Sequence, residues 1–222
     1  MTVLPLRKDE PAPDAGTPPT LWDPVVRLTH WSVAMIVLLN GLWTKGGGAL
    51  HVALGWVAMS ILALRLIWGL IGPREARFSA FPPHPVAALR HLGQLARGRP
   101  GLHGSHNPAG AMMAYVLWAC LAVLIGTGLV LSGGRTPMQV AADQAAVAAG
   151  DWSVLVASSD GQGDDQDGAT LRHLAEEVHE VTSSLILFLA ALHVAGVAVE
   201  SLALRRNLLA PMVLGRRGRR RG

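Results

Sequence analysis

The chain has little charge and a single cysteine, and each shortage excludes a class of protein. Only 15% of its 222 residues are Asp, Glu, Lys or Arg, whereas soluble domains carry about 25%. With 50% hydrophobic residues and a mean hydropathy of +0.35, the composition excludes an ordinary soluble domain and favours an integral membrane protein. Cys120 is the sole cysteine, so neither a disulfide nor a cysteine-based metal cluster can form within the chain.

Several motifs are also missing from the sequence. A zinc protease would carry the pattern His-Glu-x-x-His, but His179-Glu180 is followed by Val-Thr-Ser. The net charge is +4, yet no nucleic-acid-binding motif accompanies the basic residues, and we expect no nucleic-acid partner. No signal peptide is recognisable. Residues 1–20 contain five prolines and are predicted to form a disordered N-terminal tail.

Four long apolar segments dominate what is present. They cover about residues 25–45, 49–71, 109–131 and 174–204. Each is long enough to cross the ~30 Å hydrocarbon core of a bilayer as a helix. We therefore predict an all-α membrane protein, a four-transmembrane-helix bundle formed by one domain over residues 21–204. A loop that is acidic and expected to be mobile, residues 132–172, separates the last two spans, and a basic tail, residues 205–222, follows the bundle.

The distribution of basic residues predicts the orientation of the bundle. Lys and Arg concentrate in the N-terminal tail, in residues 74–108 between the second and third spans, and in the C-terminal tail. Because basic segments remain on the cytoplasmic side, we expect both termini to be cytoplasmic and the acidic loop to face outward. Residues 86–97 are predicted to form a short amphipathic helix on the membrane surface.

Two histidines share one face of the last span. His179 and His193 are fourteen residues apart, which brings their rings to within roughly 40° of each other around the helix and about 21 Å apart along its axis. His30 lies near the start of the first span and His51 at the start of the second. In the predicted topology, His51 and His179 lie on the outer side, and His30 and His193 lie on the inner side. The four histidines therefore sort by depth into two pairs.

Two histidine pairs in a helix bundle suit haem better than zinc. A haem iron takes two axial imidazoles from opposite sides, and each pair offers two. Zinc takes four ligands; the glutamates around His179 could complete one such site, but no equivalent residues lie near His193. Those glutamates are Glu176, Glu177 and Glu180. Any one histidine alone could be an ordinary core residue, although a histidine in lipid is costly and suggests a function.

Small residues one turn after three of these histidines would let a flat macrocycle approach the backbone. They are Ala34 after His30, Gly55 after His51 and Ser183 after His179. The remaining histidines are expected to be solvated surface residues. They are His84, His91, His103 and His106 in the arginine-rich connection and His173 just outside the last span.

Two arginines lie within or beside the spans. Arg65 follows His51 by fourteen residues, which places it at the depth of the inner pair. It either neutralises a haem propionate or extends along the membrane to the cytoplasmic headgroups, and the sequence leaves both alternatives open. Arg27 is expected to anchor the first span at the interface.

Several segments resemble the bacterial di-haem cytochrome b561 family, which includes the cytochrome b subunits of nickel–iron hydrogenases. They are LWDPVVRLTHW at 21–31, HVALGW at 51–56, RLIWGLIGP at 65–73, ARFS at 76–79, GSHNPAG at 104–110, VHE at 178–180, LHVAG at 192–196, NLLAPM at 207–212 and GRR at 215–217. The similarity extends over roughly residues 21–217. The motifs are specific in combination, although no single one is.

The resemblance implies a four-helix bundle in the bacterial cytoplasmic (inner) membrane that binds two b-type haems and exchanges electrons with quinone. It places the haem ligands at His30, His51, His179 and His193, as the pairing by depth does. The acidic loop departs from the family pattern and leaves the redox partner open between a basic c-type cytochrome and a hydrogenase-like subunit. A homodimer also remains open, as does the question whether the protein reacts with a small molecule directly or only relays electrons.

Two other functional classes compete with the cytochrome. A haem-free transporter or assembly factor would use the intramembrane histidines for metal or proton handling. Such a proton path would need carboxylates at membrane depth, and Asp and Glu are absent from the middle of every predicted span. A purely structural membrane anchor would not require the histidines at all.

Overall fold

The computed structural model describes residues 23–97, 107–154, 166–205 and 207–214. The predicted N-terminal tail, His103, His106, residues 155–165 of the acidic loop and residues 215–222 of the basic tail lie outside this part of the chain. Four helices in it are long and apolar enough to cross a membrane: α1 (Pro24–Leu42), α2 (Ala49–Ile71), α4 (Pro108–Ser132) and α7 (Gln166–Ala203). No strand occurs in the described ranges. The predicted all-α membrane bundle is confirmed.

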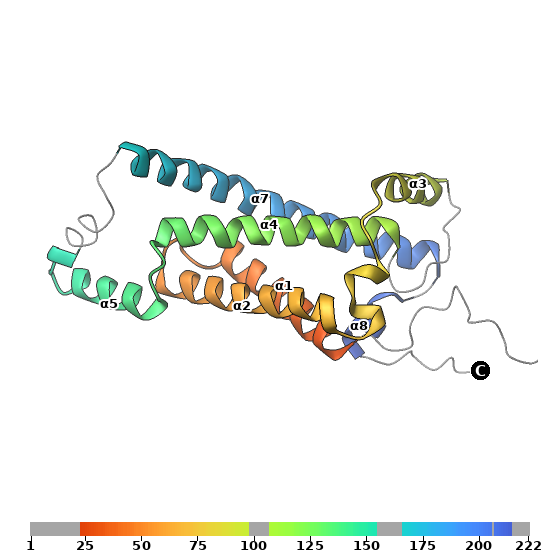
Figure 1. Cartoon of the computed structure of the whole chain (residues 1–222), viewed down its shortest axis with the longest axis horizontal. Coiled ribbons are helices and arrows are strands. Elements are labelled where there is room, and N and C mark those ends of the chain that lie inside the picture. Colours follow the sequence, from red (N-terminus) through yellow and green to blue (C-terminus); the bar gives the residue numbers. More distant parts are fainter. Residues whose placement is uncertain (1–22, 98–106, 155–165, 206, 215–222) are drawn as a thin grey trace, which may run out of the picture.

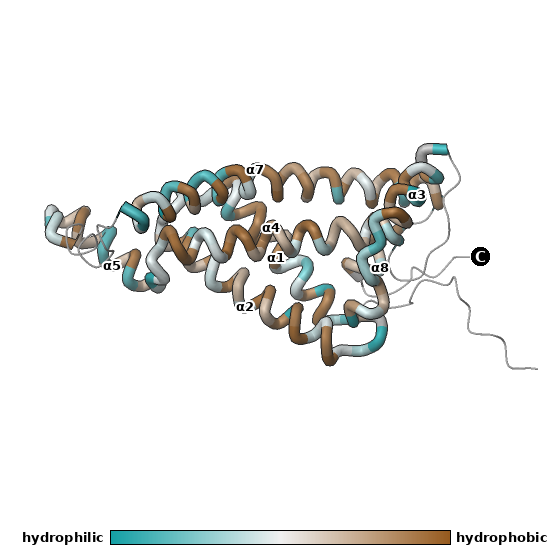
Figure 2. The backbone as a smooth tube through the Cα atoms, turned by 45° about the horizontal axis from the view of Figure 1, so that its top comes forward, coloured by the Kyte–Doolittle hydropathy of each residue, from teal (hydrophilic) through white to brown (hydrophobic). Residues whose placement is uncertain are grey.

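The four long helices run side by side, with smaller helices at the two ends of the bundle (Figure 1). Apolar residues, brown in Figure 2, predominate along the middle of α4 and α7. Helix α3 (Pro85–Ala96) lies against α4 at one end, which we call the α3 end. Helix α5 (Pro137–Ala148) lies against α2 at the other, the α5 end. Two 3-10 turns, η1 (Arg74–Ala76) and η2 (Phe78–Ala80), connect α2 to α3.

The starts of α1 and α4 follow from local sequence signals. The side chain of Asp23 accepts hydrogen bonds from the backbone N–H groups of Val25 and Val26, at 2.9 and 3.0 Å, and Pro24 occupies the first turn of α1. Asn107 caps α4 in the same way, through Gly110, ahead of Pro108. Such caps satisfy N–H groups that have no partner within the helix. They define the residues at which α1 and α4 begin.

The packed centre of the bundle combines residues from all four long helices. The buried cluster consists of Ile36, Ala58, Leu62, Cys120, Leu121 and Ile186. Ile186 lies on α7 midway between His179 and His193, seven residues from each. The core therefore fills the middle of the bundle and leaves the histidines above and below it.

The structure differs from the sequence expectation between the third and fourth long helices. Residues 137–148 form α5 inside the segment expected to be a loop, because Thr136 and Gln139 form a reciprocal capping box and Pro137 opens an alanine-rich stretch. Helix α7 begins at Gln166 rather than near residue 174, and its 38 residues extend about 57 Å. This exceeds the ~30 Å hydrocarbon core. At the α5 end, α7 projects beyond the other long helices (Figure 1).

The prediction for His91 was wrong, whereas His84 and His173 are exposed as expected. The predicted surface helix is present as α3, but His91 is only 3% exposed because it faces the bundle. Its Nε2 lies 3.7 Å from Oε1 of Glu200 on α7. Helical periodicity defines which residues share a face of α3, but it does not reveal that this face meets the nearly buried carboxylate of Glu200.

Candidate cofactor-binding site

The structure places the four candidate histidines in two pairs. The ring centroids of His51 on α2 and His179 on α7 are 6.1 Å apart, with 58° between the ring planes. Those of His30 on α1 and His193 on α7 are 6.3 Å apart, at 57°. Helix α7 thus contributes one ring to each pair, and α1 and α2 contribute the opposing rings. The two pairs have nearly the same geometry although no residue is shared between them.

The spacing within each pair leaves room for one metal centre between the rings. Imidazole–metal bonds measure about 2.0–2.1 Å, so two of them through one ion would hold the ring centroids roughly 6 Å apart. Both observed separations, 6.1 and 6.3 Å, agree with this arrangement. Within the described ranges, no three His, Cys, Asp or Glu side chains gather as a metal site. The pairs therefore fit a metal whose other ligands come from a cofactor, and a protein-only zinc site does not fit.

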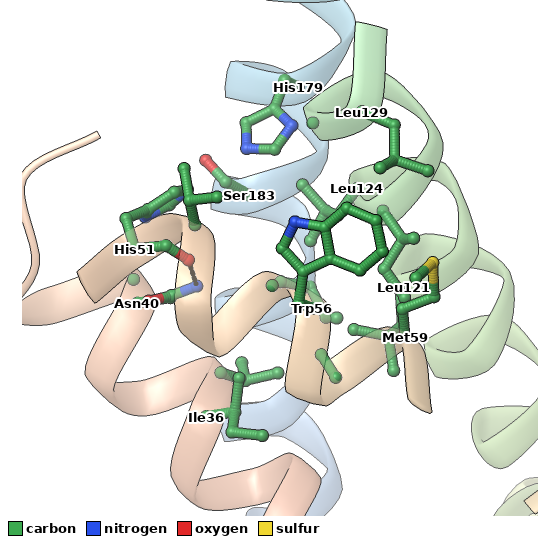
Figure 3. Close-up of a pocket in the computed structure, with 18 of the residues that line it drawn as sticks. Ile36, Asn40, His51, Trp56, Met59, Leu121, Leu124, Leu129, His179 and Ser183 are labelled. Carbon is green, nitrogen blue, oxygen red and sulfur yellow. Dashed lines mark hydrogen bonds between the residues drawn. The ribbon is translucent and has the colours of Figure 1, made fainter. Parts of the chain in front are cut away.

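A cavity adjoins the His51–His179 pair (Figure 3). It contains about 830 Å³ of space between atoms, a volume that includes its open side. All four long helices contribute to its lining, which is mainly apolar. Gly55 and Ser183, the small residues one turn after the two histidines, both line it. A side chain at Gly55 would meet no atom within 4 Å, so the backbone there is open to a flat ligand.

A threonine hydroxyl contacts the ring nitrogen Nδ1 of each histidine at this cavity. Nδ1 of His179 lies 2.8 Å from Oγ1 of Thr127 on α4. Nδ1 of His51 lies 3.1 Å from Oγ1 of Thr44, in the turn between α1 and α2. Asn40 supports the same turn, because its Nδ2 donates to the backbone oxygen of His51. Each contact leaves Nε2 of the histidine as the nitrogen available to a metal.

Neither threonine was predicted as a functional residue, because the amino-acid sequence contains no signal that would identify them. Thr127 is 52 residues from His179 in sequence, and only the packing of α4 on α7 brings them together. Thr44 lies in the turn before α2, where a threonine carries no helical periodicity. Motif spacing therefore identifies the rings but not the groups that orient them.

Arg65 adopts neither a solvated nor a lipid-headgroup position. It is 6% exposed, and its guanidinium carbon lies 4.9 Å from the ring centroid of Trp118 and 5.3 Å from that of Phe78. One terminal nitrogen donates to the carbonyl of Ala76, at 3.2 Å. The alternative in which Arg65 extends to the headgroups is therefore wrong. Arg65 also holds the η1–η2 segment against α2 and α4. Its other terminal nitrogen, Nη1, is buried and has no hydrogen-bond partner in the described part of the chain, so the propionate alternative stays a prediction.

Arg27 also makes a specific contact rather than serving only as an interfacial anchor. Its side chain donates to the carbonyls of Met212 and Val213 in α8 (Leu209–Leu214), at 3.0 and 2.6 Å. Trp31, whose ring packs edge-on against His30 with centroids 5.2 Å apart, donates to the same Met212 carbonyl. These bonds tie α8 to the start of α1, next to the His30–His193 pair.

The sequence model of one family matches the chain over residues 21–215, and that family is described as prokaryotic cytochrome b561. The chain belongs to the prokaryotic cytochrome b561 family. The match includes the four long helices and all four paired histidines, and it confirms the resemblance seen in the sequence motifs. Membership in a cytochrome b561 family implies a membrane protein of electron transport that binds b-type haem. Comparisons with curated proteins and with solved structures give no match.

Proposed function

We propose that this cytochrome b561 carries two b-type haems and passes electrons across the membrane between the quinone pool and a protein redox partner. His51 and His179 would be the axial ligands of one haem, and His30 and His193 those of the other. The observation that carries the proposal is the near-identity of the two ring separations, 6.1 and 6.3 Å, at two depths of one bundle. Bound haem supplies reversible one-electron chemistry of its iron.

The residues of the chain would bind, orient and insulate the two groups. Helix α7 fixes the distance between the sites, because its two histidines lie about 21 Å apart along the helix axis. The lining of the cavity at His51 and His179 is mainly apolar, and burial is one of the factors by which a protein sets a haem potential. Gly55 and Ser183 leave the backbone accessible on the faces of α2 and α7 that meet the cavity.

Orientation and partners are inferred from charge. The α3 end carries Arg74, Arg77, Arg90 and Arg97 among the described residues, which supports a cytoplasmic location for this end in a bacterial inner membrane. The α5 end carries Asp143, Asp151, Asp167, Glu176 and Glu177. An acidic outer face would attract a basic c-type cytochrome electrostatically; a hydrogenase-like subunit is the other partner class. Quinone would reach the bundle from the lipid.

The first test is a dithionite-reduced-minus-oxidised absorption spectrum of the purified protein, with the ratio of haem to protein. We expect two low-spin b haems per chain. His179→Ala and His193→Ala should each remove one haem or convert it to high spin. His173→Ala is the matched control, because His173 lies on the same helix α7 but is 73% exposed and faces Glu177 instead of a second imidazole.

The same spectra can overturn the proposal. A colourless protein, or a spectrum that ignores both ligand substitutions, would contradict haem binding by these pairs. It would then favour the haem-free transporter. If the wild-type protein holds a single haem and only one of the two substitutions removes it, the proposal would be restricted to the histidine pair that contains the substituted residue.

A further inference from the structure

The two histidine pairs differ in the hydrogen-bond partners of their Nδ1 atoms. At the α5 end, both Nδ1 atoms have a threonine hydroxyl as hydrogen-bond partner, Thr127 for His179 and Thr44 for His51. At the α3 end, Nδ1 of His30 is buried and has no hydrogen-bond partner in the described part of the chain. The two sites therefore have matching ring separations but unlike surroundings.

The direction of the hydrogen bond to His179 follows from the other neighbours of Thr127. The Thr127 hydroxyl lies 2.8 Å from the carbonyl oxygen of Val123 and 3.2 Å from that of Leu124. Carbonyl oxygens only accept, so the single hydroxyl proton is directed to them and the oxygen lone pair faces the imidazole. Nδ1 of His179 must then carry the proton and donate it, which leaves the lone pair on Nε2.

The same reasoning applies to His51. The Thr44 hydroxyl lies 3.2 Å from the backbone oxygen of Asn40 and 3.1 Å from the side-chain oxygen Oδ1 of that residue. Both of these atoms are acceptors, because Nδ2 of Asn40 is the nitrogen that donates to the backbone of His51. Thr44 therefore also accepts from Nδ1–H of its histidine. Two unrelated elements, a helix interior and a turn, thus provide the same contact to the two rings of one pair.

We propose that Thr44 and Thr127 are positioning residues that lower the reduction potential of the His51–His179 site relative to the same site without them. The proposal rests on haem binding by this pair. A hydrogen bond accepted from Nδ1–H fixes the ring orientation and makes the ligand nitrogen more basic. A more basic ligand stabilises oxidised iron, which carries the greater positive charge, and so lowers the potential. The effect favours residence of a shared electron at the His30–His193 site.

The test is a potentiometric titration of the haem absorption in the wild-type protein and in Thr127→Val and Thr44→Val. Valine keeps the shape of threonine and removes the hydroxyl. Substitution of a residue that hydrogen-bonds to a metal ligand typically changes metal affinity 10- to 100-fold, and we expect a change at the lower end of this range in the ratio of reduced to oxidised haem. A tenfold change in the ratio of reduced to oxidised haem corresponds to 59 mV for a one-electron couple. We expect each variant to raise the potential of one component by about this amount and to leave the other component in place.

Three further variants make the result specific. His179→Ala identifies which titration component belongs to the His51–His179 site. Thr127→Ser restores a hydroxyl and should return the potential towards the wild-type value. Thr29→Val is the matched control: Thr29 is buried, and its hydroxyl donates to the carbonyls of Val25 and Val26. No imidazole partner of this hydroxyl occurs among the residues that the structure describes. It should leave the His51–His179 component unchanged.

Each outcome has a defined meaning. A selective rise that Thr127→Ser reverses supports the proposal, whereas a selective fall in the potential of this component would overturn it. Unchanged potentials, or equal shifts in Thr127→Val and Thr29→Val, would overturn it while the wild-type spectrum still shows two haems. Absence of haem from the wild-type protein would instead overturn the proposed function.

Discussion

Nε2 of His91 on α3 lies 3.7 Å from Oε1 of Glu200 on α7, and the two side chains are only 3% and 12% exposed. Asn107, the cap of α4, donates its side-chain N–H to the same carboxylate. Glu200 therefore joins three helices at the α3 end, seven residues beyond His193 on α7. The short helix that the sequence predicts on the membrane surface is attached to the bundle by a buried polar contact.

We predict that His91→Ala loosens α3. The substitution removes one partner of a nearly buried carboxylate, with Asn107 retained as another, and the loss of one such polar contact typically costs about 0.5–1.5 kcal/mol. Hydrogen–deuterium exchange of the purified protein should show faster exchange over residues 85–96, with the absorption spectrum unchanged. His84→Ala is the control, since His84 is exposed. Equal exchange in wild type and His91→Ala would show that the contact does not hold α3.

Replacing Arg65 should destabilise the connection between α2 and α3. The guanidinium stacks on Trp118 and Phe78 and donates to Ala76, and a desolvated cation–π contact contributes up to about 2 kcal/mol. Lysine keeps the charge but lacks the planar group. We therefore expect Arg65→Lys to lower the thermal unfolding temperature in detergent, and Arg65→Met to lower it further. An unchanged unfolding temperature for both variants would contradict the structural role.

Gly69 is required where the ring of Phe78 crosses α2. A Cβ at this position would lie 2.2 Å from Cζ of Phe78, so the ring would have to move. Overpacking of this kind typically costs about 1–3 kcal/mol. Gly69→Ala should lower the unfolding temperature measurably, whereas Gly196→Ala should not, because a Cβ at Gly196 meets nothing within 4 Å. Similar unfolding temperatures for the two variants would show that Phe78 is not packed there.

Gly55 provides a way to block one site selectively. It lines the cavity beside His51 and His179, so the side chain in Gly55→Leu would occupy space that the proposed haem needs. The ratio of haem to protein should fall from two to one, with the His30–His193 component retained. Gly126→Leu adds the same side chain on an exposed face of α4 and should keep both haems. Two haems in Gly55→Leu would mean that the cofactor does not use this cavity.

Regular, local patterns allowed much of the architecture to be predicted from the sequence. The four apolar segments and the caps at Asp23 and Asn107 lie within single helices, so neighbouring residues suffice to recognise them. α5 was missed because the acidic composition of the segment suggested a loop, although Thr136, Pro137 and Gln139 form a helix start that is legible in the sequence. The early start of α7 was missed because the prediction followed hydropathy, which decreases where the helix leaves the apolar layer.

The sequence by itself determined that this protein is a membrane bundle with histidines at two depths, because a fourteen-residue spacing on one helix sets both the shared face and the axial separation. Only the tertiary structure decided which groups surround those histidines. Thr127 reaches His179 from another helix, His91 turns inward to Glu200, and Arg65 stacks between aromatic rings instead of reaching lipid. These contacts join residues far apart in the chain, and their partners are chosen by the packing of whole helices, which no local periodicity records.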